Sequence, residues 1–365
     1  MPSRTRWVAP ADLARLVARQ GLAPVMRDLA DYVLADFRRW PQFDKVARVA
    51  AHSADGVIEL MPIADDRLHA FKYVNGHPGN GRFGVPTVMA YGGLADVATG
   101  FPLMISEMTI ATALRTAVTS ALAARWLARA DARTMAVVGN GAQSEFQALA
   151  FHHLLGIDTL TVFDVDAAAT DKLCRNLAGT PGLRVVRAAS AADVVAGADI
   201  VSLLTADKRR ATVLTDAMVE PGMHINAVGG DCPGKTEVAP EVLRRASVFV
   251  EYAPQSRVEG EIQQMPADFP VTELWSVFGG TAPGRRDAAQ ITLFDSVGFA
   301  LEDFSMLRYL YDTCERLDIG ESVRLVPALP DPRDLYGALR DSGSDAGATP
   351  PPRRDQTRSK IAAMP

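Results

Sequence analysis

Cysteine is scarce in this sequence, and no two cysteines stand in a Cys-x-x-Cys spacing. The three that occur, Cys174, Cys232 and Cys314, are odd in number and far apart in a chain of 365 residues. This pattern excludes a disulfide framework and favours thiols in a reducing compartment. An apolar segment of the kind that directs secretion is also lacking after the charged first residues. We therefore expect a cytoplasmic protein.

Long hydrophobic runs and an excess of basic charge are missing as well. The most apolar stretch, residues 110–128, is interrupted by Arg115 and Arg125, so we expect no membrane span. Lys and Arg number 38 against 43 Asp and Glu, a formal net charge of -5, which argues against a nucleic-acid-binding protein. The six histidines show no metal-ligand spacing with cysteine or acidic residues, so we predict no metal site.

The composition that is present, 48% apolar and 22% charged residues, is typical of a soluble globular protein, and the length suggests two domains. Before residue 40, apolar residues recur at helical spacing. Short strand-like runs separated by turn-forming clusters then predict an antiparallel sheet, with strands at 45–51, 57–61, 70–74 and 87–91. A long helical pattern follows at 107–130.

From residue 134 onward, strand-like and helical patterns alternate, which predicts βαβ units and a parallel sheet. The predicted strands are Thr134–Val138, Leu160–Phe163, Arg184–Arg187, Ile200–Leu204, His224–Val228, Ser247–Val250 and Ile291–Phe294. The fold class predicted is therefore α/β, with a doubly wound Rossmann-type domain at 116–317. The other domain takes residues 1–115 and is completed by about 318–340, to which a helix at 299–317 leads back. The tail, 341–365, is rich in Gly, Ser, Pro and Arg and is expected to be disordered.

A glycine-rich turn between the first strand and helix of this alternation predicts a dinucleotide site. Gly139 and Gly141 stand in a G-x-G-x-x-G pattern with Ser144 at the third position. The two glycines allow a tight turn and close approach of the backbone to a pyrophosphate. Asp164 ends the next strand, 25 residues after Gly139, where a ribose-binding acid is expected. A carboxylate there favours NAD over NADP, although Asp164 could instead be a solvated turn residue.

Other strand ends carry further candidates. Thr205 and the segment Asn226–Val228 each follow a strand, at the edge where ligands bind in this architecture, unless these segments are ordinary turns. Asp231 comes next, on a Gly- and Pro-rich loop, where it could take and return protons during hydride chemistry. Cys232 beside it is interpreted as a small buried thiol. Lys235 could reach a cofactor phosphate or be solvated.

Three charged residues, Arg48, Glu59 and Lys72, interrupt the apolar strands of the first domain. Symmetric hairpins centred between residues 53 and 54 and between residues 65 and 66 would place all three side by side on one face. If that face lines a cleft, Arg48 and Lys72 form a clamp for a carboxylate and Glu59 can hold a cation, which suits an amino acid with a second amine. The alternative is a salt-bridge ladder on a solvated face.

Taken together, these segments resemble the ornithine cyclodeaminase / mu-crystallin family, with collinear matches from about Arg48 to about Leu329. The stretches that carry the resemblance are Arg48-Val-Ala, Gly56-Val-Ile-Glu-Leu-Met-Pro62, Phe71-Lys-Tyr-Val-Asn-Gly-His-Pro78, Glu107-Met-Thr-Ile-Ala-Thr-Ala-Leu-Arg115-Thr, Gly139-Asn-Gly-Ala-Gln-Ser-Glu-Phe-Gln147, Thr205-Ala-Asp-Lys208, Asn226-Ala-Val-Gly-Gly-Asp-Cys-Pro-Gly-Lys-Thr-Glu237, Glu259-Gly-Glu-Ile-Gln-Gln264 and Phe294-Asp-Ser-Val-Gly-Phe-Ala-Leu-Glu-Asp303.

The resemblance implies a homodimer in which one domain binds NAD and the other binds substrate and dimerises through an antiparallel, barrel-like sheet. It implies that Arg48 and Lys72 hold the carboxylate of L-ornithine, that Glu59 lies near its amines, that Val297 contacts it and that Asp231 is the proton donor and acceptor. The residues expected to contact NAD, from the motif and the resemblance together, are Thr87, Arg115, Gly139, Gly141, Ala142, Gln143, Asp164, Thr205, Asn226, Ala227, Val228, Lys235 and Ser296.

The activity implied is conversion of L-ornithine to L-proline and ammonia with NAD used catalytically. The alternatives within the same scaffold are an imino-acid (ketimine) reductase, an alanine dehydrogenase, or a cyclodeaminase that acts on lysine or another basic amino acid. A non-catalytic, crystallin-like protein that binds a dinucleotide is a further alternative.

Overall fold

The computed structural model describes residues 4–206 and 210–340. The predicted disordered tail, 341–365, lies outside the described residues, as do Asp207 and Lys208. Residues up to Val323 form one compact unit, and the residues from Arg324 onward, which include helix α11 (Gly337–Arg340), form a separate one.

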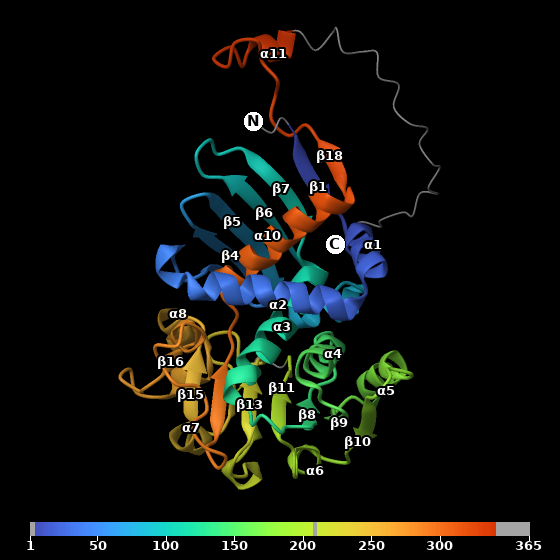
Figure 1. Ribbon diagram of the computed structural model, residues 1–365, viewed down its shortest axis with the longest axis vertical. Helices are drawn as coiled ribbons and strands as arrows, with labels where there is room; N and C mark the ends of the chain where they lie inside the picture. Colours follow the sequence, from blue (N-terminus) through green and yellow to red (C-terminus); the bar gives the residue numbers. More distant parts are fainter. Residues whose placement is uncertain (1–3, 207–209, 341–365) are drawn as a thin grey trace. The chain divides into compact units, whose positions relative to one another are not determined.

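A mixed, mostly antiparallel sheet occupies the first part of the chain (Figure 1). Its strand order is β18-β1-β7-β6-β5-β4-β2, with β3 also paired to β4 and with β1 and β7 parallel. The predicted antiparallel sheet is thus confirmed, but β1, β7 and β18 were not predicted. The strands are β1 (Thr5–Val8), β2 (Asp44–Lys45), β3 (Val49–His52), β4 (Val57–Ala64), β5 (Leu68–Gly76), β6 (Ala90–Asp96), β7 (Pro102–Glu107) and β18 (Glu321–Val323).

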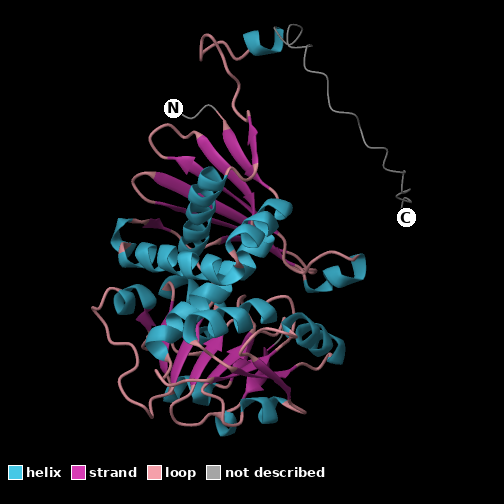
Figure 2. Ribbon diagram, turned by 45° about the vertical axis from the view of Figure 1, so that its right-hand side comes forward, coloured by secondary structure: helices cyan, strands magenta, loops and turns pink. Residues whose placement is uncertain are grey.

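A second sheet is entirely parallel, as the alternation of strands and helices predicts (Figure 2). Its order is β10-β9-β8-β11-β13-β17-β15-β16, so the chain winds outward in both directions from β8, as in a doubly wound fold. The strands are β8 (Thr134–Val138), β9 (Thr159–Phe163), β10 (Arg184–Arg187), β11 (Ile200–Leu203), β13 (His224–Ala227), β15 (Ser247–Val250), β16 (Thr272–Glu273) and β17 (Thr292–Asp295).

The remaining elements are helices and one small two-stranded sheet. The longer helices are α1 (Pro10–Gln20), α2 (Leu22–Arg38), α3 (Thr109–Leu127), α4 (Ser144–Leu155), α5 (Ala167–Leu177) and α10 (Ala300–Leu317). The shorter ones are α6 (Ala191–Val195), α7 (Pro240–Arg245), α8 (Ala253–Glu259), α9 (Leu274–Phe278), η1 (Trp40–Gln42), η2 (Pro78–Phe83), η3 (Asp216–Met218) and η4 (Glu261–Gln264); strands β12 (Arg210–Leu214) and β14 (Thr236–Val238) pair with each other.

Helices α2, α3 and α10 join the two sheets through one continuous apolar core. Helix α10 packs on β4, β5 and β6, while α2 crosses it and also contacts α3, α4 and α9 (Figure 1). Helix α3 is rich in Ala and Leu, and most of its residues, including every residue from Leu114 to Ala124, are buried, because it is covered on both sides. This burial explains why the longest apolar stretch of the sequence is a core helix. Within the described residues, no helix is both long and apolar enough to cross a membrane.

The two hairpins that carry the charged residues differ from the predicted register. In the structure Glu59 faces Ala50 and Val74, and Lys72 faces Met61, so each pairing is shifted by two residues. The reason is that both turns are centred one residue later than predicted, with Ser53 N donating to Gly56 O and Asp65 N to Leu68 O. A register shift of two residues leaves each side chain on the predicted face of the sheet, because side chains alternate between the two faces along a strand. Arg48 itself precedes β3.

Strand β4 shows which face of this sheet is buried. Its burial alternates along Val57–Ala64, so that Glu59 and Met61 are buried while Ile58 and Leu60 are 40% and 44% exposed. The solvated ladder considered from the sequence is therefore wrong, because Glu59 and Lys72 lie on the inner face. The outer face is apolar instead.

Asp36 on α2 provides a test of how the helices are held together. Its carboxylate is fully buried and accepts hydrogen bonds from Ser305 Oγ at 2.8 Å, Arg308 Nη2 at 2.9 Å and Arg39 Nε at 2.9 Å. We expect Asp36→Ala to lower the free energy of unfolding in urea by about 2 kcal/mol or more, since hydrogen bonds to a charged group are lost and polar partners stay buried. Asp31→Ala, an exposed acid on the same helix, is the control. Equal stability of both variants would contradict the expectation.

Candidate functional site

The glycine-rich turn after β8 has the shape of a phosphate-binding loop. Gly139 has a φ of +96°, and a Cβ there would lie 2.8 Å from the carbonyl carbon of Leu204 on the neighbouring strand end. Gly141 borders open space instead. Ala142 is exposed beside it, and the buried Oε1 of Gln143 has no hydrogen-bond partner within the described residues. The turn therefore leaves room at the start of α4 for close approach of a ligand to the backbone, as in dinucleotide-binding turns.

Asp164 lies beside this turn at the carboxyl end of β9. Its Oδ2 accepts a hydrogen bond from Asn140 N at 2.6 Å and its Oδ1 from Asp166 N at 2.8 Å. Ser144, at the third glycine position, is buried and donates from Oγ to Gly141 O at 2.8 Å. Asp164 thus braces the turn, and each of its oxygens retains a lone pair that a ribose hydroxyl could use.

The carboxyl ends of β11, β13 and β17 lie next to each other and bring the other strand-end candidates together. Asn226 Nδ2 donates to Ser202 Oγ at 3.2 Å, and Ser296 N donates to Ala227 O at 2.9 Å. Thr205 follows β11, and its carbonyl accepts from Lys235 Nζ at 2.7 Å. Thr87 differs from its prediction: it is not part of a strand, because β6 begins only at Ala90.

Arg48 lies between the two sheets and is held by both. Its side chain is 6% exposed, and its guanidinium contacts Glu59 Oε2 at 2.9 Å and Glu259 Oε2 at 3.0 Å. Its Nη2 also donates to the carbonyl oxygens of Val297 and Gly298, each at 2.6 Å. Burial raises the pKa of Glu259 to about 7, against the opposing effect of Arg48. One cation is thus shared by two carboxylates, which leaves an excess of negative charge around it.

Lys72 belongs to a second buried cluster, built on α3 and α10. Lys72 Nζ lies 2.8 Å from Asp303, whose Oδ1 also accepts from Arg115 Nε at 3.0 Å, and Arg115 Nη1 contacts Glu302 at 2.5 Å. Burial and the neighbouring Arg115 lower the pKa of Lys72 to about 8. Burial raises the pKa of Glu302. The structure therefore groups Arg115, a predicted NAD contact, with Lys72, a predicted substrate contact.

Several of these acidic partners were missed by the sequence analysis: Glu251, Glu259, Glu302 and Asp303. Glu251 accepts from Ser296 Oγ at 2.8 Å and from the amide nitrogens of Val297 and Gly298 at 3.3 and 3.2 Å. The available signal was the placement of acids in apolar surroundings, such as Glu302 and Asp303 between Leu301 and Phe304. Such isolated acids are rarely buried without a partner.

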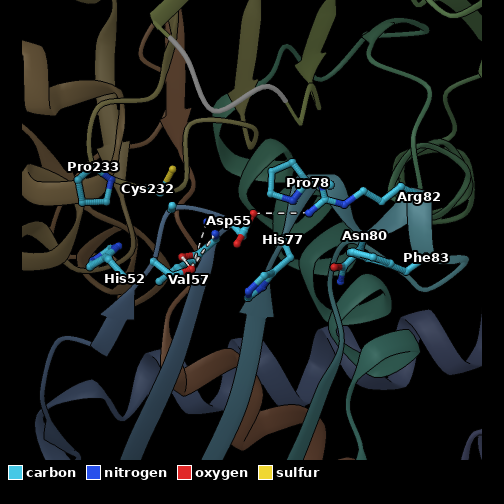
Figure 3. A pocket seen from close by; sticks show the side chains of 14 residues that line it. His52, Asp55, Val57, His77, Pro78, Asn80, Arg82, Phe83, Cys232 and Pro233 are labelled. Carbon is cyan, nitrogen blue, oxygen red and sulfur yellow. Dashed lines mark hydrogen bonds and ion pairs between the residues drawn. The ribbon is translucent and has the colours of Figure 1, made fainter. Parts of the chain in front are cut away.

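Asp231 lies on a loop close enough to the first cluster for its charge to raise the pKa of Arg48 and Glu259. Its side chain is 56% exposed and lies 3.7 Å from the buried Lys235. The neighbouring residues, Cys232 and Pro233, form one wall of a cavity of about 690 Å³ (Figure 3). The other walls come from the β3–β4 turn, with His52 and Asp55, and from the loop after β5, with His77, Pro78, Asn80, Arg82 and Phe83. A small molecule in this cavity would therefore lie beside the Asp231 loop.

Comparison with known proteins agrees with this geometry. The model of the "Ornithine cyclodeaminase/mu-crystallin family" matches residues 13–317. The chain belongs to this family. An ornithine cyclodeaminase of Brucella melitensis is 57% identical over 333 residues, covering 91% of this chain and 92% of the relative.

Two solved structures of similar fold extend the comparison. A lysine cyclodeaminase, studied for recognition of L-lysine, L-ornithine and L-2,4-diaminobutyric acid, is 32% identical with a TM-score of 0.85, covering 91% of this chain and 99% of the other. An archaeal alanine dehydrogenase dimer with bound NAD is 27% identical with a TM-score of 0.81, covering 88% of this chain and all of the other. Members of similar fold thus act on different amino acids.

Asp164 allows a direct test of the dinucleotide site. We expect Asp164→Ala to raise the dissociation constant of NAD about tenfold or more and to reduce discrimination against NADP, because a ribose acceptor and a repelling charge are both lost. Fluorescence titration with each dinucleotide measures this. Asp166→Ala removes an equal charge two residues away, where the carboxylate caps α5, and should leave the NAD-to-NADP ratio unchanged. Equal ratios in both variants would show that cofactor choice is made elsewhere.

Proposed function

We propose that this protein is an NAD-dependent ornithine cyclodeaminase, which converts L-ornithine to L-proline and ammonia. The observation that carries the proposal is the buried group of Arg48, Glu59 and Glu259 beside the Asp231 loop, on the same chain as a dinucleotide-binding turn. The 57% identity to the Brucella melitensis ornithine cyclodeaminase supports it. This group combines a cation for the carboxylate of a diamino acid with carboxylates for its amines.

The charges of the two clusters complement L-ornithine. Arg48 and Lys72 supply cations for its carboxylate, and Glu59 and Glu259 supply carboxylates for its ammonium groups. A substrate with two amines matches the excess of negative charge around Arg48 better than a substrate with one. Val297 borders the group of charges around Arg48, because its carbonyl oxygen accepts a hydrogen bond from Arg48.

NAD, when bound at the turn after β8, supplies a reversible acceptor for the hydride on the substrate Cα, so that the reaction has no net oxidation. Asp231 takes a proton from the side-chain ammonium, which makes that amine a nucleophile for Cα. Asp231 then returns a proton to the departing α-nitrogen, which leaves as ammonia. Lys235, 3.7 Å away, keeps the carboxylate in place. The atoms balance, because one nitrogen leaves and the other closes the ring.

The fate of the atoms tests this function. L-Ornithine deuterated at Cα should give proline that retains deuterium at Cα, since the hydride leaves and returns within one turnover. L-Ornithine with nitrogen-15 in the α-amine should release the label as ammonia. Mass spectrometry of proline and ammonia measures both outcomes, and Asp231→Asn serves as the variant that should lose about 10²–10⁴-fold in rate.

Other results would replace the proposal. Loss of the deuterium to solvent would indicate proton abstraction, and label retained in the ring would mean that the other amine leaves. Net accumulation of NADH with alanine, or consumption of NADH with a cyclic imine, would identify one of the redox activities of the family. Faster cyclisation of L-lysine than of L-ornithine would show that the protein is a lysine cyclodeaminase.

Lys72 makes carboxylate binding depend on pH. With its pKa lowered to about 8 by burial, Lys72 is charged below that pH and neutral above it. We therefore expect the dissociation constant of pentanoate, a carboxylate without amines, to be constant below about pH 7 and to rise 10- to 100-fold by about pH 10, since a hydrogen bond to a charged group contributes about 1.5–3 kcal/mol. Calorimetry in the presence of NAD measures it. Lys72→Met should bind weakly at every pH; a flat wild-type profile would remove Lys72 from the clamp.

We also propose that the protein acts as a homodimer in the cytoplasm, joined through the outer face of the mixed sheet. Apolar side chains form a continuous row across that face, because Val49 pairs with Leu60, Leu60 with Tyr73 and Tyr73 with Tyr91. Val49 is 63% exposed and Tyr91 48% exposed. A large apolar face of this kind is characteristic of a protein interface. Residues 1–115 would then serve both substrate binding and dimerisation, and residues 116–317 would bind NAD.

Leu60→Asp tests the dimer. A carboxylate at the centre of the row would have to be buried in the interface, so we expect the variant to be monomeric at concentrations where the wild type is dimeric. Light scattering during size-exclusion chromatography measures the mass. Val97→Asp is the control, because Val97 is also 44% exposed but lies in the turn after β6. A dimeric Leu60→Asp variant would place the interface on another surface.

A further inference from the structure

Three buried carboxylates, Glu237, Glu261 and Asp295, form a chain behind the Asp231 loop. Asp295 accepts hydrogen bonds from the amide nitrogens of Glu261 at 2.8 Å and Ile262 at 3.1 Å. Glu261 in turn accepts from the amides of Glu237 at 2.8 Å and Val238 at 3.0 Å. Each carboxylate thus fixes the backbone that carries the next, from the end of β17 through η4 to β14.

Glu237 ends this chain at Thr205. Its Oε1 accepts from both the amide nitrogen and the hydroxyl of Thr205, while Lys235 Nζ donates to the Thr205 carbonyl at 2.7 Å. Thr205 is therefore held at three atoms. The other oxygen, Glu237 Oε2, is buried and makes no hydrogen bond within the described residues. Burial raises the pKa of Glu237.

The unbonded oxygen instead lies against Gly229, the first of the two glycines that precede Asp231. A Cβ added at Gly229 would overlap Glu237 Oε2, and one added at Gly230 would lie 2.5 Å from Glu261 Oε1. Neither glycine has a positive φ, so the glycines are required for space and not for an unusual backbone conformation. The backbone that leads into Asp231 thus rests directly on two buried carboxylates.

We propose that Glu237 is a positioning residue for the reaction: its carboxylate sets the backbone of Gly229 and Thr205 and thereby the place of Asp231. This inference rests on the proposed function. Glu237 acts through its neighbours, since its side-chain contacts are with Thr205 and the glycine backbone. Because a displacement of about 1 Å can lower a rate about 10²-fold, the loss of this support should reduce turnover more than it reduces substrate binding.

A double-mutant cycle tests the contact. We expect Gly229→Ala to lower kcat for L-ornithine about 10²-fold, with KM for L-ornithine at saturating NAD changed less than about threefold, because the new methyl group displaces the loop. Glu237→Ala should likewise lower kcat much more than it changes KM. The double variant should be no worse than Glu237→Ala alone, since the overlapping carboxylate is gone. Glu237→Gln should restore kcat to within about threefold, because its amide oxygen can still accept from Thr205.

Asp199→Ala is the matched control for a purely structural role. Asp199 also accepts from two backbone amides, those of Arg133 at 2.8 Å and Thr134 at 2.9 Å, but at the amino ends of the parallel strands. We expect it to lower thermal stability while kcat and KM stay close to the wild type. Additive losses in the cycle, or a Glu237→Ala profile equal to that of Asp199→Ala, would overturn the inference.

A readout without substrate separates this inference from the proposed function. Amide hydrogen exchange in peptides covering 203–206 and 226–238 should become faster in Glu237→Ala and stay near wild type in Glu237→Gln. If the wild type makes no proline from L-ornithine, the proposed function fails, yet the exchange data still decide whether Glu237 holds the loop. Unchanged exchange in Glu237→Ala would overturn the positioning role even in an active ornithine cyclodeaminase.

Discussion

Removing the guanidinium of Arg48 from water is the constraint on which the site depends. A cation that is only 6% exposed must find acceptors within the protein. Arg48 finds them on β4 with Glu59, on α8 with Glu259 and on the segment between β17 and α10 with two carbonyls. Three parts of the chain are therefore fixed around one side chain: a strand of the mixed sheet, helix α8, and the segment that follows β17 of the parallel sheet. The proposed substrate site lies where they meet.

The second cluster is also held by buried ion pairs, and its own two cations and two acids are close to electroneutrality. Lys72 and Arg115 share Asp303, and Glu302 completes the set. Burial lowers the pKa of Lys72 and raises that of Glu302, so both groups are driven toward their neutral forms. A ligand that brings one carboxylate and two ammonium groups replaces these internal partners without leaving an unpaired charge in the core. Recognition of such a ligand would be an exchange of ion pairs.

Local patterns predicted the parallel sheet and the glycine-rich turn, since apolar runs and glycines act within a few residues. They did not predict β1, which is four residues long and contains an arginine, or β7, which begins with Pro102. The hairpin register was wrong because a turn centre misplaced by one residue shifts every pair by two. Lys72 was recognised as unusual, but its partner Asp303 is 231 positions away, and no local pattern encodes that distance. The partners of buried charges can therefore be identified only once the fold is known.

The charged groups proposed to bind substrate and the one proposed to transfer protons lie in different environments. Arg48, Lys72 and their partners are buried and paired, which holds them in one geometry. Asp231 is 56% exposed beside a cavity, so its carboxylate keeps access to water and can exchange protons. Exposure alone would leave such a group mobile on its loop. The loop is instead fixed from behind by Glu237 and Glu261, whose burial is possible because they bind backbone amides and a hydroxyl. In the proposed mechanism the buried acids would supply rigidity, and the exposed Asp231 would supply reactivity.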